Sequence, residues 1–158
     1  SPSAGDRAIF DQAGTSGVIL MLGTRDLGQF LFLGDYTGPG MATASPITAT
    51  GLLRLSGIDG VGVISEVNHE ITLSDRIVLS GDQKWILDSE SGSLRQHGAM
   101  AAGSRSLNLA SYTLTLNPVQ SGNAFYLNNP VSGTGAIAVE GATDISAHGG
   151  WRAWLATR

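Results

Sequence analysis

The chain has 158 residues, of which 14% are charged and 42% are hydrophobic, and its net charge is −4. This length favours a single domain, and the nine scattered Lys and Arg residues form no basic stripe of the kind that binds nucleic acid. The absence of cysteine excludes disulfides and thiolate metal sites. Its longest apolar runs are far shorter than the ~20 residues of a membrane span.

The first 15 residues are predicted to form a polar N-terminal arm, followed by one all-β domain over 16–158. The apolar anchors of the arm are Ile9 and Phe10. Because a polar leader frays unless something holds it, we expect Ile9 and Phe10 to contact a neighbouring subunit.

Two dense apolar segments follow the arm, at residues 17–23 and 30–34. Neither alternates with polar residues, which predicts that both of their faces are covered. Residues 23–29 between them are predicted to form a hairpin turn. Residues 35–50 are rich in turn-forming Gly and Pro and predict a long loop. Loops of this length commonly carry interactions, so we expect Tyr36 to contact a partner.

From residue 51 onward, short units with large residues two apart alternate with turns of Ser, Gly, Asp, Asn and Pro. A period of two is that of a strand with one buried face. The eight units are 53–55, 71–73, 77–79, 85–87, 107–109, 114–116, 125–127 and 137–139.

Three pairs of these units are 22 to 24 residues apart, namely Leu53 and Ile77, Trp85 and Leu107, and Leu114 and Ile137. Solenoid proteins stack repeats of about this length, so the spacing predicts an all-β, short-strand β-solenoid. The alternative is a β-sandwich or jelly roll, which also has closely spaced short strands. Such hairpin folds favour Asn-Gly or Asp-Gly turns, and Asp59-Gly60 is the one such dipeptide.

The tail at 149–155 is apolar on both faces if it is extended. Trp151 shares a face with Ala153 and Leu155 and is predicted to point inward. Arg152 and Trp154 share the other face. Because aromatic residues and Arg are enriched at interface centres, we expect Arg152 and Trp154 to be contact residues.

The three histidines show no metal-ligand spacing. His97 and His148 lie in separate predicted turns, far from His69. His69 and its neighbour Glu70 would point to opposite faces of a strand, so they cannot act together as acid and base.

Asp88 and Glu90 are about 6–7 Å apart if the chain is extended, a spacing found in glycosidases. We interpret them instead as part of a solvated turn after Leu87. Residues 133–138 match Gly-x-Gly-x-x-Ala, but a strand is predicted after them where a dinucleotide site needs a helix. The chain is therefore predicted to be non-enzymatic, with no catalytic residue, no cofactor and no metal.

Residues 85–94, 98–103 and 106–117 resemble the passenger-domain repeats of bacterial autotransporters and the β-helical segments of phage tail and adhesin proteins. Residues 132–141 resemble the glycine-rich step before an alternating strand in such repeats. We expect neither a translocating barrel nor a signal sequence, and we expect the chain to be too short for a depolymerase tailspike.

The resemblance implies a non-enzymatic virion structural protein of a tailed phage. It would be a capsid decoration (cement) protein or a small tail or fibre subunit, located in the virion. We expect a homo-oligomer, a trimer, that contacts other virion proteins and stabilises the particle. The alternative is an extracellular or cell-surface bacterial adhesin, or an autotransporter-passenger fragment, that binds a surface glycan.

Overall fold

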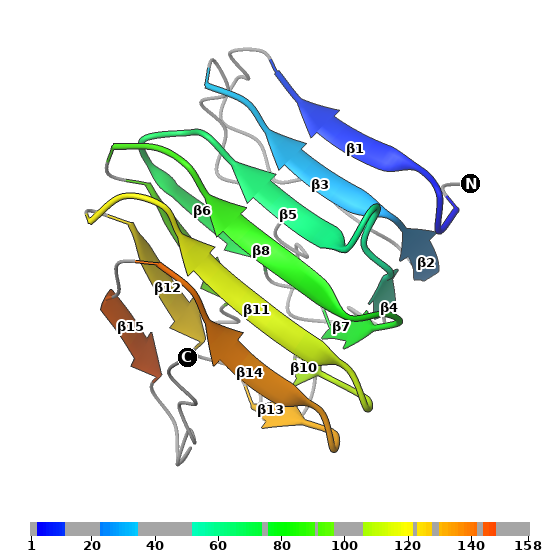
Figure 1. Cartoon of the computed structure of the whole chain (residues 1–158). Coiled ribbons are helices and arrows are strands. Elements are labelled where there is room, and N and C mark those ends of the chain that lie inside the picture. Colours follow the sequence, from blue (N-terminus) through cyan, green and yellow to red (C-terminus); the bar gives the residue numbers. More distant parts are fainter. Residues whose placement is uncertain are drawn as a thin grey trace.

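The computed structural model describes residues 3–11, 23–34, 52–73, 76–90, 92–96, 106–121, 123–127, 130–141 and 144–147. Over these ranges the protein is built of fifteen short strands and contains no helix (Figure 1). The predicted all-β class is confirmed.

The strands form three sheets, and within each sheet neighbouring strands run parallel. Sheet A consists, in order, of β1 (Arg7–Phe10), β3 (Gln29–Phe32), β5 (Val61–Ser65), β8 (Gln83–Leu87), β11 (Thr113–Pro118) and β14 (Ala136–Val139). Sheet B consists of β2 (Thr24–Leu27), β4 (Leu52–Leu55), β7 (Arg76–Leu79), β10 (Leu107–Asn108) and β13 (Val131–Ser132). Sheet C consists of β6 (Glu70–Leu73), β9 (Ser93–Gln96), β12 (Ala124–Leu127) and β15 (Asp144–Ala147).

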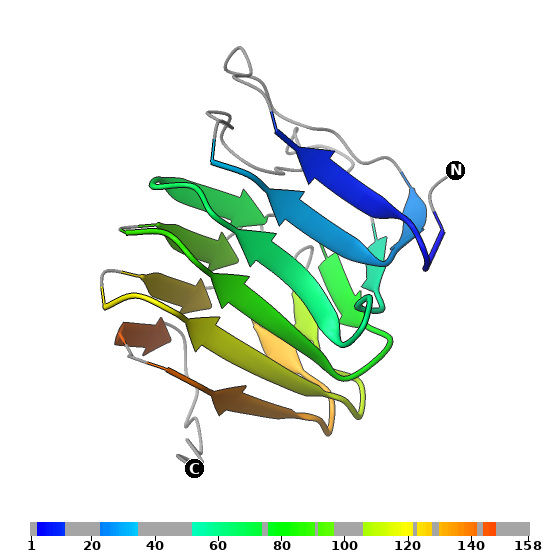
Figure 2. The same cartoon turned by 45° about the horizontal axis from the view of Figure 1, so that its top comes forward.

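Consecutive strands belong to different sheets. From β4 onward the chain passes through sheet B, then A, then C, and repeats this order to β15. Each of these strands therefore lies beside the strand three steps further along, and β1 and β14 lie at opposite ends of sheet A (Figure 2). Neighbours in a β-sandwich or jelly roll run antiparallel, so the parallel pairing does not fit that alternative.

Two of the three predicted spacings coincide with the register of the sheets. Leu53 pairs with Ile77, and Leu114 pairs with Ile137. These partners are 24 and 23 residues apart, so one passage through the three sheets takes about the length that the sequence predicts. All eight predicted units contribute to strands.

The third predicted spacing is wrong. Trp85 pairs with Leu116, not with Leu107, and Leu107 pairs with Ile77. The reason is topological: β8 belongs to sheet A and β10 to sheet B, so the two strands are not neighbours despite their spacing along the chain.

The predicted hairpin turn at 23–29 is also wrong. Thr24–Leu27 form β2 in sheet B and Gln29–Phe32 form β3 in sheet A, so the two strands are not paired with each other. Gly28 lies between them, where a Cβ atom would be 2.7 Å from the Ala4 carbonyl oxygen and from Ile58 Cγ1. The close approach at this corner therefore requires glycine.

The Asp59-Gly60 dipeptide does form a tight turn. Both residues have positive φ, 52° and 75°, and Ile58 and Val61 exchange two backbone hydrogen bonds of 2.9 Å across it. This is the geometry that two-residue turns favour, and within the described residues it is the one antiparallel bridge.

Part of the predicted N-terminal arm belongs to a sheet. Arg7–Phe10 form β1, which pairs with β3 along its whole length. The boundary predicted at residue 15 lies outside the described residues.

The core consists of the inward side chains of the three sheets. In β8, Trp85 and Leu87 are buried, whereas Lys84 and Ile86, which alternate with them along the strand, are half-exposed. Because the strands are parallel and in register, inward residues stack on their counterparts: Val63 pairs with Trp85. Burying such side chains contributes about 1.5–3 kcal/mol each.

Two polar side chains are built into this core. Gln83 Nε2 donates to the Leu55 carbonyl oxygen at 2.8 Å, which joins sheet A to sheet B. Trp85 Nε1 donates to Gln83 Oε1 at 3.0 Å. A Cβ atom at Gly62 would overlap Gln83 Oε1, so this glycine makes room for the pair.

Ser65 lies in the same core, with Phe32 and Leu87 as its neighbours in register. It is fully buried, and its Oγ has no hydrogen-bond partner among the described residues. A buried hydroxyl without a partner costs about 1–3 kcal/mol of desolvation.

We expect Ser65→Ala to leave the free energy of unfolding unchanged or to raise it by up to about 1 kcal/mol, because the substitution removes the unsatisfied hydroxyl. Urea unfolding followed by circular dichroism measures this. A loss of more than about 1 kcal/mol would show that the hydroxyl is bonded or that its volume is needed.

Candidate contact surface

A row of aliphatic side chains runs along the outer face of sheet A. In register, Ile9 of β1 pairs with Leu31 of β3, Leu31 with Ile64 of β5, and Ile64 with Ile86 of β8. Ile9 is 54% exposed, and the other three are half-buried. These four residues, the aliphatic row, alternate with inward residues and therefore point away from the core.

Charged residues lie on both sides of the aliphatic row. Two residues before it on their strands are Arg7 and Lys84, the basic flank. Two residues after it are Asp11, Glu66 and Asp88, the acidic flank, and all three are exposed. On β1 and β8 the row thus lies between a basic and an acidic residue, and on β5 an acidic residue follows it.

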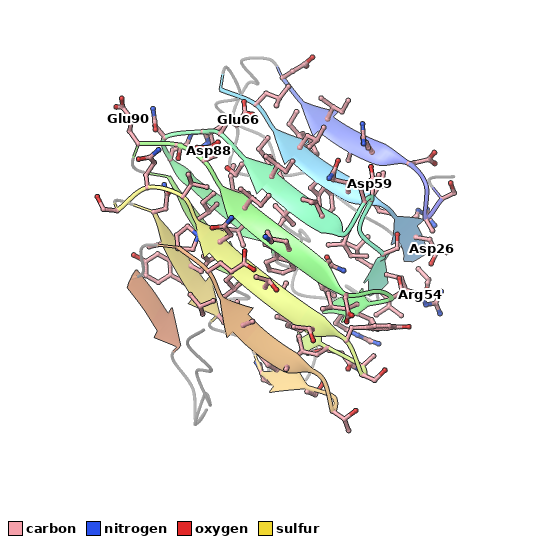
Figure 3. The ribbon with its side chains drawn as sticks, in the orientation of Figure 1. Asp26, Arg54, Asp59, Glu66, Asp88 and Glu90 are labelled. Carbon is pink, nitrogen blue, oxygen red and sulfur yellow. The ribbon has the colours of Figure 1, made fainter. Side chains whose placement is uncertain are left out.

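The sheet ladder continues past the strand ends and positions the acidic flank. The backbone N–H of Glu66 donates to the Phe32 carbonyl oxygen, and that of Asp88 donates to the Ser65 carbonyl oxygen, both at 2.8 Å. Glu66 and Asp88 therefore follow neighbouring strands, about 4.8 Å apart. Figure 3 shows both near the arrowhead end of sheet A.

The basic flank includes an ion pair within the chain. Lys84 Nζ lies 2.5 Å from Glu140 Oε2, with side-chain exposures of 34% and 54%. A second surface pair, Arg54 with Asp26 at 3.6 Å, lies on sheet B (Figure 3). Exposed pairs of this kind contribute about 0–1 kcal/mol, so neither determines the fold.

The predicted contact residues divide into three groups. Ile9 lies on the aliphatic row and is exposed. Phe10 packs against the core, with its ring stacked on Phe32 at a centroid distance of 4.8 Å. Tyr36, Arg152 and Trp154 lie outside the described residues, as does Trp151.

Sequence reasoning missed Leu31, Ile64 and Ile86 as surface residues. A signal was present, because Ile86 occupies the middle position of the predicted unit 85–87, which must point outward if Trp85 and Leu87 point inward. That the outward positions line up across four strands follows only from the register.

The residues considered for catalysis or metal binding do not come together in one cluster. Asp88 and Glu90 are both exposed in the corner between β8 and β9, and the Glu90 N–H donates to Asn68 Oδ1 at 2.9 Å. Within the described residues, no three His, Asp or Glu side chains come together as a metal group. His69 is half-buried beside this corner, and His97 and His148 lie outside the described residues.

The glycine-rich match at residues 133–138 leads directly into β14, which is a strand. A phosphate site of the dinucleotide type needs the N-terminus of a helix at this point. The arrangement therefore gives this segment no such site.

The chain matches no protein-family model, no curated protein and no solved structure. Among the described residues there is no helix of the length and hydrophobicity that a membrane span needs.

Buried hydrogen bonds hold the corner that carries the acidic flank. Asn123 is 1% exposed, and its Nδ2 donates to the Ser89 carbonyl oxygen at 2.7 Å. The Gln120 N–H donates to Asn123 Oδ1 at 2.9 Å, and the Gly92 N–H donates to Ser89 Oγ at 2.9 Å. One amide side chain therefore ties this corner to the next one in the stack.

We expect Asn123→Ala to lower the free energy of unfolding by about 1–3 kcal/mol, because it leaves buried backbone groups unpaired. Asn68→Ala is the matched control, since Asn68 is exposed and water can replace its bond to Glu90. Chemical unfolding of both variants measures the difference. Equal losses would contradict the role given to the buried amide.

Proposed function

We propose that the chain is a β-solenoid with a non-enzymatic, structural role, and that it acts as a homo-oligomer through subunit contacts. The solenoid is supported by the repeated passage through sheets B, A and C and by the in-register stacking of inward residues. Each repeat covers its neighbours, so such a fold forms a stiff body with extended flat faces.

The observation that carries the structural role is the aliphatic row. Parallel sheets normally have both faces covered, yet the outer face of sheet A presents Ile9, Leu31, Ile64 and Ile86 in one line. Polar residues at these outward positions would suit a solvent-exposed face and would not affect the core. Aliphatic residues in these positions favour a face that other subunits cover.

The setting we propose is the virion of a tailed phage, as a capsid decoration protein or a small tail or fibre subunit, with a trimer as the assembly unit. This setting rests on the resemblance of residues 85–94, 98–103, 106–117 and 132–141 to β-helical virion and adhesin repeats. Binding between subunits would stabilise the particle by mass action.

We expect the purified chain to sediment as an oligomer whose mass is a multiple of 16.3 kDa. Its melting temperature should rise with protein concentration, because dissociation accompanies unfolding. Analytical ultracentrifugation and melting curves measure both. A monomer with a concentration-independent melting temperature would contradict the proposal. Binding to a glycan array, without self-association, would favour the adhesin alternative.

A further inference from the structure

We propose that copies of this chain associate side by side through the outer face of sheet A, with their stacking directions, from β1 to β14, parallel. The inference rests on the proposed structural role and adds the surface, the partner and the orientation. It follows from the order of the basic flank, the aliphatic row and the acidic flank across the face.

The three features occur in the same order on two strands of sheet A. On β8 the basic flank supplies Lys84, the aliphatic row Ile86 and the acidic flank Asp88, at intervals of two residues. On β1 the same order is Arg7, Ile9 and Asp11. The first and fourth strands of sheet A therefore present the same sequence of basic, aliphatic and acidic side chains.

A second copy that faces this surface with a parallel stacking direction meets it with complementary charge. A twofold axis along the stacking direction places each strand opposite the same strand of the second copy and exchanges the two flanks. Lys84 then lies opposite the second copy's Asp88, and Arg7 opposite its Asp11. The aliphatic row meets the aliphatic row, and each charge contact occurs twice.

An antiparallel arrangement loses this match. A twofold axis along the strands keeps each flank on its own side, so that Glu66 and Asp88 of one copy face the acidic flank of the other. Juxtaposed like charges disfavour an interface. The charge order thus selects the parallel orientation.

Other charges near the basic flank do not reverse the argument. Lys84 is bonded to Glu140, but an ammonium group has three donors and this one is partly exposed. Asp82 directly precedes β8, and its Oδ1 already accepts the Thr113 N–H at 2.7 Å. Asp59 lies in the tight turn before β5.

The size of the face sets the expected strength. Six strands at about 4.8 Å span about 24 Å, and four residues along a strand span about 13 Å. The resulting footprint of roughly 300 Å² is well below the ~800 Å² per partner of a standard interface. The association should therefore depend on concentration. Three copies around a threefold axis along the stacking direction would also place the basic flank of each copy beside the acidic flank of the next.

The test uses two charge reversals in the full chain, Lys84→Glu and Asp88→Lys. Each variant alone places like charges opposite each other, so its self-association should be at least about tenfold weaker than that of the wild type. An equimolar mixture of the two variants restores opposite charges at every such contact. In sedimentation velocity, the mixture should associate within about threefold of the wild-type affinity.

Arg54→Glu is the matched control, because it reverses an ion-paired cation on sheet B and should change the affinity less than about twofold. Ile86→Glu and Val78→Glu form a second matched pair, since both residues are half-buried and point outward on sheets A and B. Melting curves identify any variant that fails to fold. Only Ile86→Glu should abolish association.

Three results would overturn the inference. A mixture no stronger than its components would exclude the parallel orientation. If Lys84→Glu, Asp88→Lys and Ile86→Glu all associate like the wild type, this face is excluded as the contact surface. The proposed structural role would still hold in that case, because the wild type is an oligomer. A wild type that stays monomeric at all concentrations would remove both.

Discussion

The constraint on which the rest of the structure depends is the in-register stacking of parallel strands. Each inward position lies on the corresponding position of the next strand in its sheet, so each inward side chain packs on the inward side chain of the neighbouring strand. Phe10 stacks on Phe32 and Val63 pairs with Trp85 for this reason. The inward side chains of all three sheets contribute to the core.

The same constraint arranges the surface. Outward positions also fall into lines across the strands, so a residue choice repeated on several strands becomes a continuous feature. Ile64 and Ile86 are separated along the chain by a passage through the other two sheets, yet they are direct neighbours on the face. The charged residues beside them are aligned by the same register. The face therefore has a basic and an acidic side, which distinguishes one orientation of association from the other.

Much of the fold could be predicted from the sequence because its signals are local. The period of two in units such as 85–87 identifies the strands, and Leu53 with Ile77 gives the length of one passage. The partner of Trp85 could not be predicted, because segments of different length separate the sheets. β2 was missed because Thr24–Leu27 has one buried side chain, Leu27, and no apolar alternation.

The candidate surface was predictable only in part. Ile9 was predicted from the sequence as an anchor that contacts a neighbouring subunit, but its alignment with Leu31 and Ile64 depends on register, which no local pattern contains. Since the chain has no cysteine, Ala138→Cys on the outer face of β14 accepts a single spin label. Dipolar electron paramagnetic resonance between copies then measures the orientation most directly. Parallel association predicts a distance of about 20 Å. An antiparallel pair centred on the aliphatic row would displace the two labels by about 34 Å along the stack, so a distance of about 35 Å would contradict parallel association.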